Sequence, residues 1–209
     1  MKNNNRETKA CDTQSLNPYK QRTDESHIRP FAHSSIRPIA LIPIGNAPVN
    51  LLHSLVDPLS AIFGRPCQVG GVVPLPPSAY NRRRGQYAGR SILSLLAGLD
   101  VPNAGRVLGI VDADCYAPGL DFIFGRARMG VRARAAFIAL PRLRQSFYNL
   151  AEDKPLFRKR ALKEAIHELG HTYGLDHCPD VTCVMYSSTG LHDTDVKRAG
   201  FCLHCRTRL

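Results

Sequence analysis

The chain has 209 residues, which is enough for one ordinary domain, and its 44% apolar and 22% charged residues are a globular balance. The 28 Lys and Arg exceed the 17 Asp and Glu and give a formal net charge of +11. No run of residues approaches the roughly 20 consecutive apolar positions of a membrane span, so we expect no membrane partner.

Residues 1–36 form a polar segment that we expect to be a disordered tail. Its large aliphatic and Phe residues are only Leu16, Ile28, Phe31 and Ile36, so it cannot bury much apolar surface. No apolar block follows the charged residues at its start, as a secretory signal would require. We therefore expect a cytoplasmic protein.

Residues 37–209 are expected to form a single domain in which strands and helices alternate at first. Short buried strands are predicted at 39–44, 67–73 and 107–111, and helices at 50–63 and 87–99. Further strands are predicted at 122–124 and 131–140, and helices at 142–150 and 155–173. This order predicts an α/β (α+β) fold.

A basic stretch lies in the second half of the chain. Ten Lys and Arg fall between Arg126 and Arg160, against only Glu152 and Asp153. Such a surface could recognise nucleic acid, an anionic membrane or acidic peptides, and it could equally be a solvated face. Aromatic residues are not interleaved there as in a base-stacking platform, so nucleic acid is not favoured.

Within this stretch, arginines alternate with small residues from Val131 to Phe137. In an extended segment this alternation puts Arg132 and Arg134 on one face. We expect an edge strand here.

The long helix carries His167, Glu168 and His171 in an HExxH pattern. Two histidines four residues apart lie on the same side of a helix, so both imidazoles can reach one ion. Glu168 projects beside them, where it can act as a general base without being a ligand. A bare HExxH also occurs by chance on helix surfaces.

Three residues after His171, Gly174 can end the helix in a conformation that other residues avoid, and His177 follows. The turn would bring a third imidazole back to the first two. Three histidine ligands leave the fourth position of a zinc ion open for water, which is the condition of a catalytic site.

Four of the seven cysteines lie close to the carboxyl end of the chain: Cys178, Cys183, Cys202 and Cys205. Two close pairs of thiolates meet the tetrahedral demand of a structural zinc ion. Disulfides are a weaker interpretation because no export signal accompanies these residues. A site in which His192 or His204 replaces one thiolate remains open. Because His177 and Cys178 are adjacent, we expect the two metal sites to be coupled.

The span from His167 to Cys205 resembles the archaemetzincins, a family of the metzincin clan of zinc peptidases. It contains HExxHxxGxxH, the four cysteines and a methionine, Met185, soon after the third histidine. The segments 76–80, 84–87 and 119–125 also resemble family segments.

The resemblance implies a metzincin-like fold with a mixed twisted sheet, flanking helices and an active-site helix. A catalytic subdomain would span 37–176, and a short zinc-stapled subdomain would span 177–209. It implies two zinc ions, and each site has its own residues. The catalytic ion would be held by His167, His171 and His177, and the structural ion by Cys178, Cys183, Cys202 and Cys205.

The implied activity is hydrolysis of peptide bonds by a zinc-activated water, with Glu168 as general base and acid. Met185 would form the turn beneath the metal, although a methionine there could simply fill core space. In metzincins the substrate lies along an edge strand, and here Arg132 or Arg134 would favour acidic side chains. We expect a monomer that acts on a peptide or protein substrate.

Two other functions fit the sequence. The first is a non-catalytic zinc-binding module that binds acidic peptides or nucleic acid through its basic surface. Glu168 argues against it, because a pure binding module has no need of a carboxylate beside an open metal position. The second is a zinc hydrolase that acts on a non-protein amide.

Overall fold

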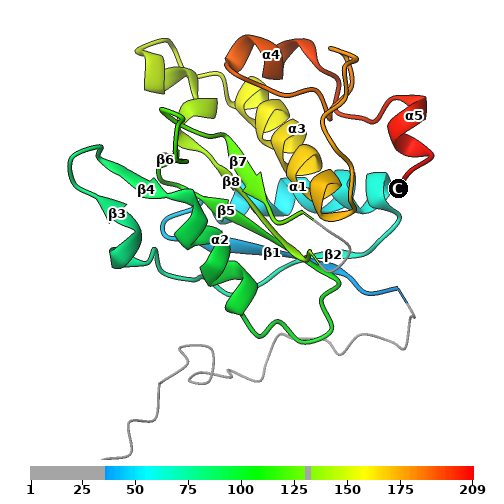
Figure 1. Ribbon diagram of the computed structural model, residues 1–209, viewed down its shortest axis with the longest axis horizontal. Helices are drawn as coiled ribbons and strands as arrows, with labels where there is room; N and C mark the ends of the chain where they lie inside the picture. Colours follow the sequence, from blue (N-terminus) through cyan, green and yellow to red (C-terminus); the bar gives the residue numbers. More distant parts are fainter. Residues whose placement is uncertain (1–35, 130–132) are drawn as a thin grey trace, which may run out of the picture. The chain divides into compact units, whose positions relative to one another are not determined.

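Five strands form the central sheet of the molecule in the computed structural model, which describes residues 36–129 and 133–209 (Figure 1). In spatial order they are β2 (Cys67–Val69), β1 (Ile39–Ile44), β5 (Arg106–Val111), β8 (Ala135–Ala139) and β7 (Gly125–Ala127). Neighbouring strands are parallel except β7, which runs antiparallel to β8. The sheet is therefore mixed, as the family resemblance implies.

Helices cover both faces of this sheet (Figure 1). Helices α1 (Val49–Phe63) and α3 (Lys154–Thr172) share one buried apolar cluster with Leu108 and Ile110 of β5. On the opposite face, a Cβ added to Gly109 would lie 2.7 Å from Leu96 of α2 (Gly89–Gly98). Because both faces are covered, β1 and β8 are buried along their whole length and read as continuous apolar runs.

A smaller sheet supports the loop beside β7. It consists of β3 (Tyr80–Asn81), β4 (Gln86–Ala88) and β6 (Cys115–Tyr116). From this sheet Arg84 Nη2 and Gln86 Nε2 donate to the carbonyl of Asp121 at 2.8 and 2.9 Å. Two of the segments that resemble the family, 84–87 and 119–125, therefore contact each other directly.

The carboxyl-terminal part packs on α3. It contains two short helices, α4 (Leu191–Val196) and α5 (Leu203–Arg206). Arg160 of α3 forms a bidentate pair with Asp195 of α4 at 2.7 and 2.6 Å. Cys183, Val184 and Met185 belong to the same apolar cluster as the inner face of α3.

Most predicted elements are present, and at two places the predicted element type is wrong. Residues 122–124 form no strand, because their backbone bonds two different partners: Ile123 N donates to Cys115 O and Phe124 O accepts from Ala139 N. Residues 142–150 form no α-helix. They contain two 3-10 turns, η3 (Pro141–Leu143) and η4 (Gln145–Tyr148), and the second ends at Asn149 with φ of 60°. The strand predicted at 67–73 is shorter and ends at Val69.

The edge-strand prediction for 131–137 is also wrong. Residues 130–132, which include Arg132, lie outside the described part of the chain. From Ala135 onward the segment is β8, which pairs with β5 on one side and with β7 on the other. Its five residues are all buried, as in an interior strand. The edge strand at this side of the sheet is β7.

The predicted tail lies outside the described residues, apart from Ile36. The described residues all belong to one compact unit that spans 33–209. Among them, no helix has the length and apolarity needed to cross a membrane.

Candidate active site and metal centres

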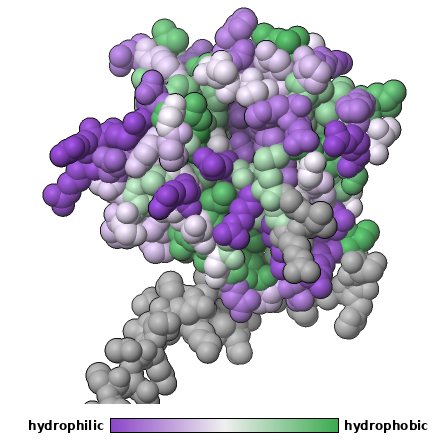
Figure 2. All heavy atoms as spheres, in the orientation of Figure 1, coloured by the Kyte–Doolittle hydropathy of each residue, from purple (hydrophilic) through white to green (hydrophobic). Residues whose placement is uncertain are grey.

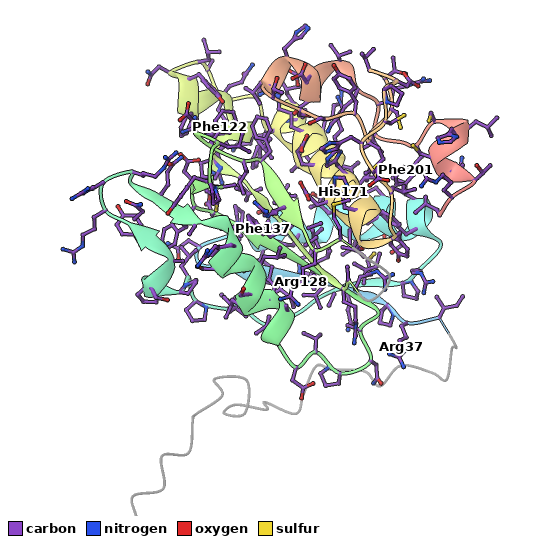
Figure 3. All side chains as sticks on the ribbon, viewed as in Figure 1. Arg37, Phe122, Arg128, Phe137, His171 and Phe201 are labelled. Atoms are coloured by element: carbon purple, nitrogen blue, oxygen red, sulfur yellow. The ribbon has the colours of Figure 1, made fainter. Side chains whose placement is uncertain are left out.

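Helix α3 carries three of the predicted site residues on its buried side. It starts after Asp153, whose side chain accepts from Leu156 N at 2.8 Å and caps the helix. His167, Glu168 and His171 follow in its last turns and are all buried, and Figure 3 shows His171 on this helix. A helix thus fixes the spacing of the two imidazoles.

Two main-chain carbonyls orient these imidazoles. His167 Nδ1 lies 2.8 Å from Val184 O, and His171 Nδ1 lies 2.7 Å from Leu175 O. A carbonyl can only accept, so each Nδ1 carries the proton and each Nε2 has a free lone pair. Burial lowers the pKa of both imidazoles, that of His167 well below its usual value, and so favours the neutral form.

The two Nε2 atoms face each other at 3.1 Å. Two lone pairs at this distance have no proton to share in these tautomers. Two nitrogen ligands of one tetrahedral zinc ion, each about 2.0–2.1 Å from the metal, lie about 3.3 Å apart. The pair therefore fits a zinc ion.

The third histidine reaches the same place through the turn at Gly174, where φ is 89°. The ring centroid of His177 lies 5.3 Å from that of His167 and 5.0 Å from that of His171. One ligand atom from each of the three histidines lies within 4.8 Å of the others. The arrangement predicted from HExxHxxGxxH is present.

Glu168 lies beside this trio. Burial, and next the neighbouring carboxylate of Glu164, raise the pKa of its carboxyl well above the usual value. A Cβ added to Gly125 of β7 would lie 2.6 Å from Glu168 Cγ and 2.7 Å from Glu168 Oε1. The carboxylate therefore rests directly on the backbone of the edge strand.

A cavity of about 390 Å³ opens onto these groups. Its floor is formed by Glu164, His167, Glu168 and His177. One wall is the largely apolar segment 120–125 and the other is the polar segment 187–189. A peptide-sized groove thus runs past the histidine trio.

The four carboxyl-terminal cysteines form a second cluster. The Sγ atoms of Cys178, Cys183, Cys202 and Cys205 lie within 4.8 Å of one another. Cys178 Sγ is 3.7 Å from Cys202 Sγ, close to the separation of about 3.8 Å that two thiolates of one tetrahedral zinc ion adopt. A disulfide would need about 2.05 Å, and the six described cysteines are free.

Neither His192 nor His204 belongs to this cluster. Cys202 N donates to Cys183 Sγ at 3.3 Å. The donor set is therefore four sulfur atoms, which suits a structural zinc ion.

Met185 lies beneath the active-site helix and is fully buried. Its sulfur lies 2.5 Å from the place where a Cβ on Gly170 would be. Only a glycine at this position of HELGH lets the methionine approach the helix so closely.

Of the two arginines proposed to select substrates, Arg134 does not line the cavity. Arg134 donates from Nε and Nη2 to the carbonyls of Gly105 and Ala104. It lines a different pocket, together with Leu96 and Arg128. Arg132 lies outside the described residues.

Three residues near the site were missed by sequence reasoning. Glu164 precedes His167 by three positions and so shares its helix face, a signal that helical spacing could have revealed. Gly125 and Lys197 gave no such signal, because their places depend on strand pairing and on a long loop.

Comparison with known proteins identifies the family. Residues 71–209 match the model of peptidase family M54. The archaemetzincin of Pyrococcus abyssi (strain GE5 / Orsay) is 40% identical over 177 residues, covering 82% of this chain and 93% of the relative. The chain belongs to the archaemetzincin family, peptidase family M54. As a member of this family it is a zinc metallopeptidase, as the sequence predicted.

Solved structures agree with this membership. The crystal structure of archaemetzincin from Methanopyrus kandleri matches with a TM-score of 0.74 and 37% identity, over 84% of this chain and 94% of that one. A zinc-dependent peptidase from Methanocorpusculum labreanum matches with a TM-score of 0.72 and 27% identity, over 81% of this chain and 98% of that one. The predicted metzincin-like fold is confirmed.

Proposed function

We propose that this M54 chain hydrolyses peptide bonds at a zinc ion held by His167, His171 and His177, with Glu168 as general base and acid. The observation that carries the proposal is the pair of unprotonated Nε2 atoms that face each other at 3.1 Å beside a buried carboxylate. His167 and Glu168 line the cavity, and His171 belongs to the same histidine group.

Each group at the site has its own role in the proposed reaction. A zinc ion at the trio supplies Lewis-acid polarisation of the scissile carbonyl and lowers the pKa of water. Glu168 accepts the proton of the attacking water at its carboxylate and then delivers it to the nitrogen of the leaving amine. Gly125 holds that carboxylate against β7, and the carbonyls of Val184 and Leu175 keep the imidazoles in their ligand tautomers.

A second zinc ion, held by the four cysteines, has a structural role in this proposal. Four thiolates fill the coordination sphere and leave no position for water. Met185 forms the turn beneath the catalytic site, between the two metal centres. The chain would thus carry two zinc ions.

The substrate peptide would lie along β7 rather than along 131–137. Within residues 36–129 and 133–209, strand β7 pairs only with β8, so its outer edge is free to add a strand, and it continues the cavity wall 120–125. Leu120, Phe122 and Ile123 make this wall apolar. No described Lys or Arg lines the cavity, so we expect neutral, apolar side chains to be preferred over acidic ones.

The alternative of a basic binding module receives less support. Within the stretch 126–160, Arg142, Arg144 and Arg160 pair with Asp114, Asp112 and Asp195. The other described Lys and Arg of this stretch are exposed, and further exposed arginines lie on the β3–β4 hairpin at 82–84, in the strongly hydrophilic projection of Figure 2. We place the protein in the cytoplasm as a monomer, since free thiols of this kind persist in reducing compartments.

Metal analysis combined with a peptide-library digest tests this function. The parent and Glu168→Gln proteins should both contain two zinc ions per chain, and only the parent should cleave peptides. The isosteric amide keeps the shape of the site but cannot accept the proton. Equal cleavage by the two proteins would rule out Glu168 as the base, and acidic peptides cleaved best would contradict the apolar wall.

A further inference from the structure

A fully buried lysine lies behind the polar wall of the active-site cavity. The side chain of Lys197 is 0% exposed, and its Nζ lies 2.9 Å from Glu164 Oε1, in a side chain that is 3% exposed. Lys197 follows α4, whereas Glu164 lies on α3 one turn before Glu168. The pair thus joins the loop region to the active-site helix.

Residues from several elements contact the carboxylate of Glu164. The same Oε1 atom accepts from Thr194 Oγ1 of α4 at 3.0 Å and from Ser188 Oγ at 3.4 Å. Glu164 also lines the cavity together with His167 and Glu168. One carboxylate therefore connects the helix that carries the chemistry with the wall 187–189.

Three consecutive carbonyls show what the lysine holds in place. Val184 O receives the bond from His167 Nδ1 at 2.8 Å, and Met185 O receives Cys178 N, next to His177, at 2.9 Å. Tyr186 O lies 3.5 Å from Lys197 Nζ. The segment 184–186 thus contacts the first histidine ligand, the loop of the third one, and Lys197.

We propose that Lys197 is a positioning residue for catalysis. Its Nζ contacts both the Glu164 carboxylate of α3 and the Tyr186 carbonyl. These two contacts hold the segment 184–186 and the cavity wall 187–189 in position beside the histidine trio. Lys197 itself is buried and does not touch substrate. This inference rests on the peptidase function proposed above.

A contribution to stability does not by itself explain why the Lys197–Glu164 ion pair is buried. Desolvation of two charges commonly offsets their attraction, so a buried ion pair often contributes little to stability. Thr194 and the apolar cluster already join α4 and its loops to α3. What the pair adds is a fixed position for the backbone beside the metal ligands.

The test compares two double variants at the same α3–α4 interface. Glu164→Gln/Lys197→Met removes both charges, so that no unpaired charge stays buried. Arg160→Met/Asp195→Asn is the matched control, because it removes a bidentate pair between the same helices that does not line the cavity. Tm, zinc content, kcat, KM and hydrogen exchange of the 186–190 backbone are measured for both and for the parent.

We expect the Glu164/Lys197 variant to bind zinc and to melt close to the control, with kcat lowered ~10–100-fold, as for residues that orient metal ligands. Exchange at 186–190 should be faster than in the parent, and the control should show neither change. Parent-like kcat and exchange would overturn the proposal, and so would an equal loss of kcat in the control. If the double variant does not fold, Glu164→Asp, which keeps both charges and withdraws the carboxylate from Lys197 Nζ by one methylene, must show the same changes at smaller size, and parent behaviour overturns the proposal.

The outcome is separable from that of the proposed function. If the parent cleaves no peptide, the peptidase proposal fails, whereas hydrogen exchange at 186–190 still decides whether Lys197 holds this segment.

Discussion

At the scale of single residues, Gly125 determines the position of Glu168, the proposed general base. A Cβ there would lie 2.6 Å from Glu168 Cγ and equally close to the carbonyl oxygen of Phe137. Real Cβ atoms do not approach other atoms this closely, so the carboxylate or the strand must shift. The position of Glu168 therefore depends on a residue that has no side chain.

We predict that Gly125→Ala lowers kcat about 100-fold, since a misplacement of about 1 Å can cost that much. It should also lower the free energy of unfolding by about 1–3 kcal/mol through overpacking. Zinc content should stay at the parent level. Gly98→Ala is the control, because nothing lies within 4 Å of the added Cβ. Parent-level kcat in Gly125→Ala would contradict this role.

A second residue-scale prediction concerns Cys115, which is fully buried. Burial raises the pKa of its thiol to about 12, so almost no thiolate exists at pH 8. Iodoacetamide should leave Cys115 unmodified in the native protein and modify it in denaturant, as read by mass spectrometry. Because the pKa of this thiol in the folded protein lies above the ordinary value of 9.0, the stability contributed by the neutral thiol is lost as the pH rises from 9 towards 12. Rapid native modification would disprove this burial.

The histidine trio was predictable from sequence because one helix carries two of its members and a glycine turn brings the third back to them. The spacing of His167, His171 and His177 is local, and local geometry fixes it. The partners that orient them are not local. Val184 follows His167 by 17 residues and Lys197 follows Glu164 by 33, and no periodicity signals such contacts.

At the scale of elements, helix α3 packs its inner face in the apolar core and also carries His167, Glu168 and His171. Its amino-terminal cap can be tested separately from these residues. Asp153 accepts from Leu156 N at the end of the helix far from the histidines. We predict that Asp153→Ala lowers the free energy of unfolding by about 1 kcal/mol and Tm by about 2–4 °C. Asp153→Asn, a cap of similar strength, should have a smaller effect, and kcat should be unchanged in both. Equal Tm values for Asp153→Ala and the parent would show that the cap contributes nothing.

Element types were predicted well where burial follows the local pattern. The strands at 39–44 and 107–111 and the helices α1, α2 and α3 are present. The wrong predictions, at 122–124 and 142–150, lie where side chains and backbone bond distant partners: Phe124 O with Ala139 N, and Arg142 with Asp114. The order of the strands was not predicted either. An edge strand was predicted at 131–137, whereas β8 is an interior strand and β7 forms the edge beside it.

At the scale of the whole molecule, the histidine trio and the cysteine cluster share one segment. Cys183 belongs to the sulfur cluster, and the next two residues offer their carbonyls to His167 and to Cys178 N. The adjacency of His177 and Cys178 is a second link. The clusters should therefore lose metal together.

We predict that Cys205→Ser lowers the zinc content below two and weakens zinc affinity at the histidine trio by about 10–100-fold. Zinc is measured by elemental analysis after equilibration with buffered free metal. Cys67→Ser is the control, because Cys67 belongs to neither cluster. An unchanged content of two in Cys205→Ser would refute the four-thiolate site, and loss of only one ion with full affinity at the trio would refute the coupling.

The carbonyls of Leu175 and Val184 have a consequence for how this site tolerates mutation. The atoms that hold the imidazoles belong to the main chain, so apolar exchanges at these two positions leave them in place. Removing or adding one residue between His171 and Leu175 would displace the first of these oxygens, and a change of length between Leu175 and Val184 would displace the second. Variation in chain length here should thus be far more damaging than variation in residue type, a pattern that deletion scanning would reveal.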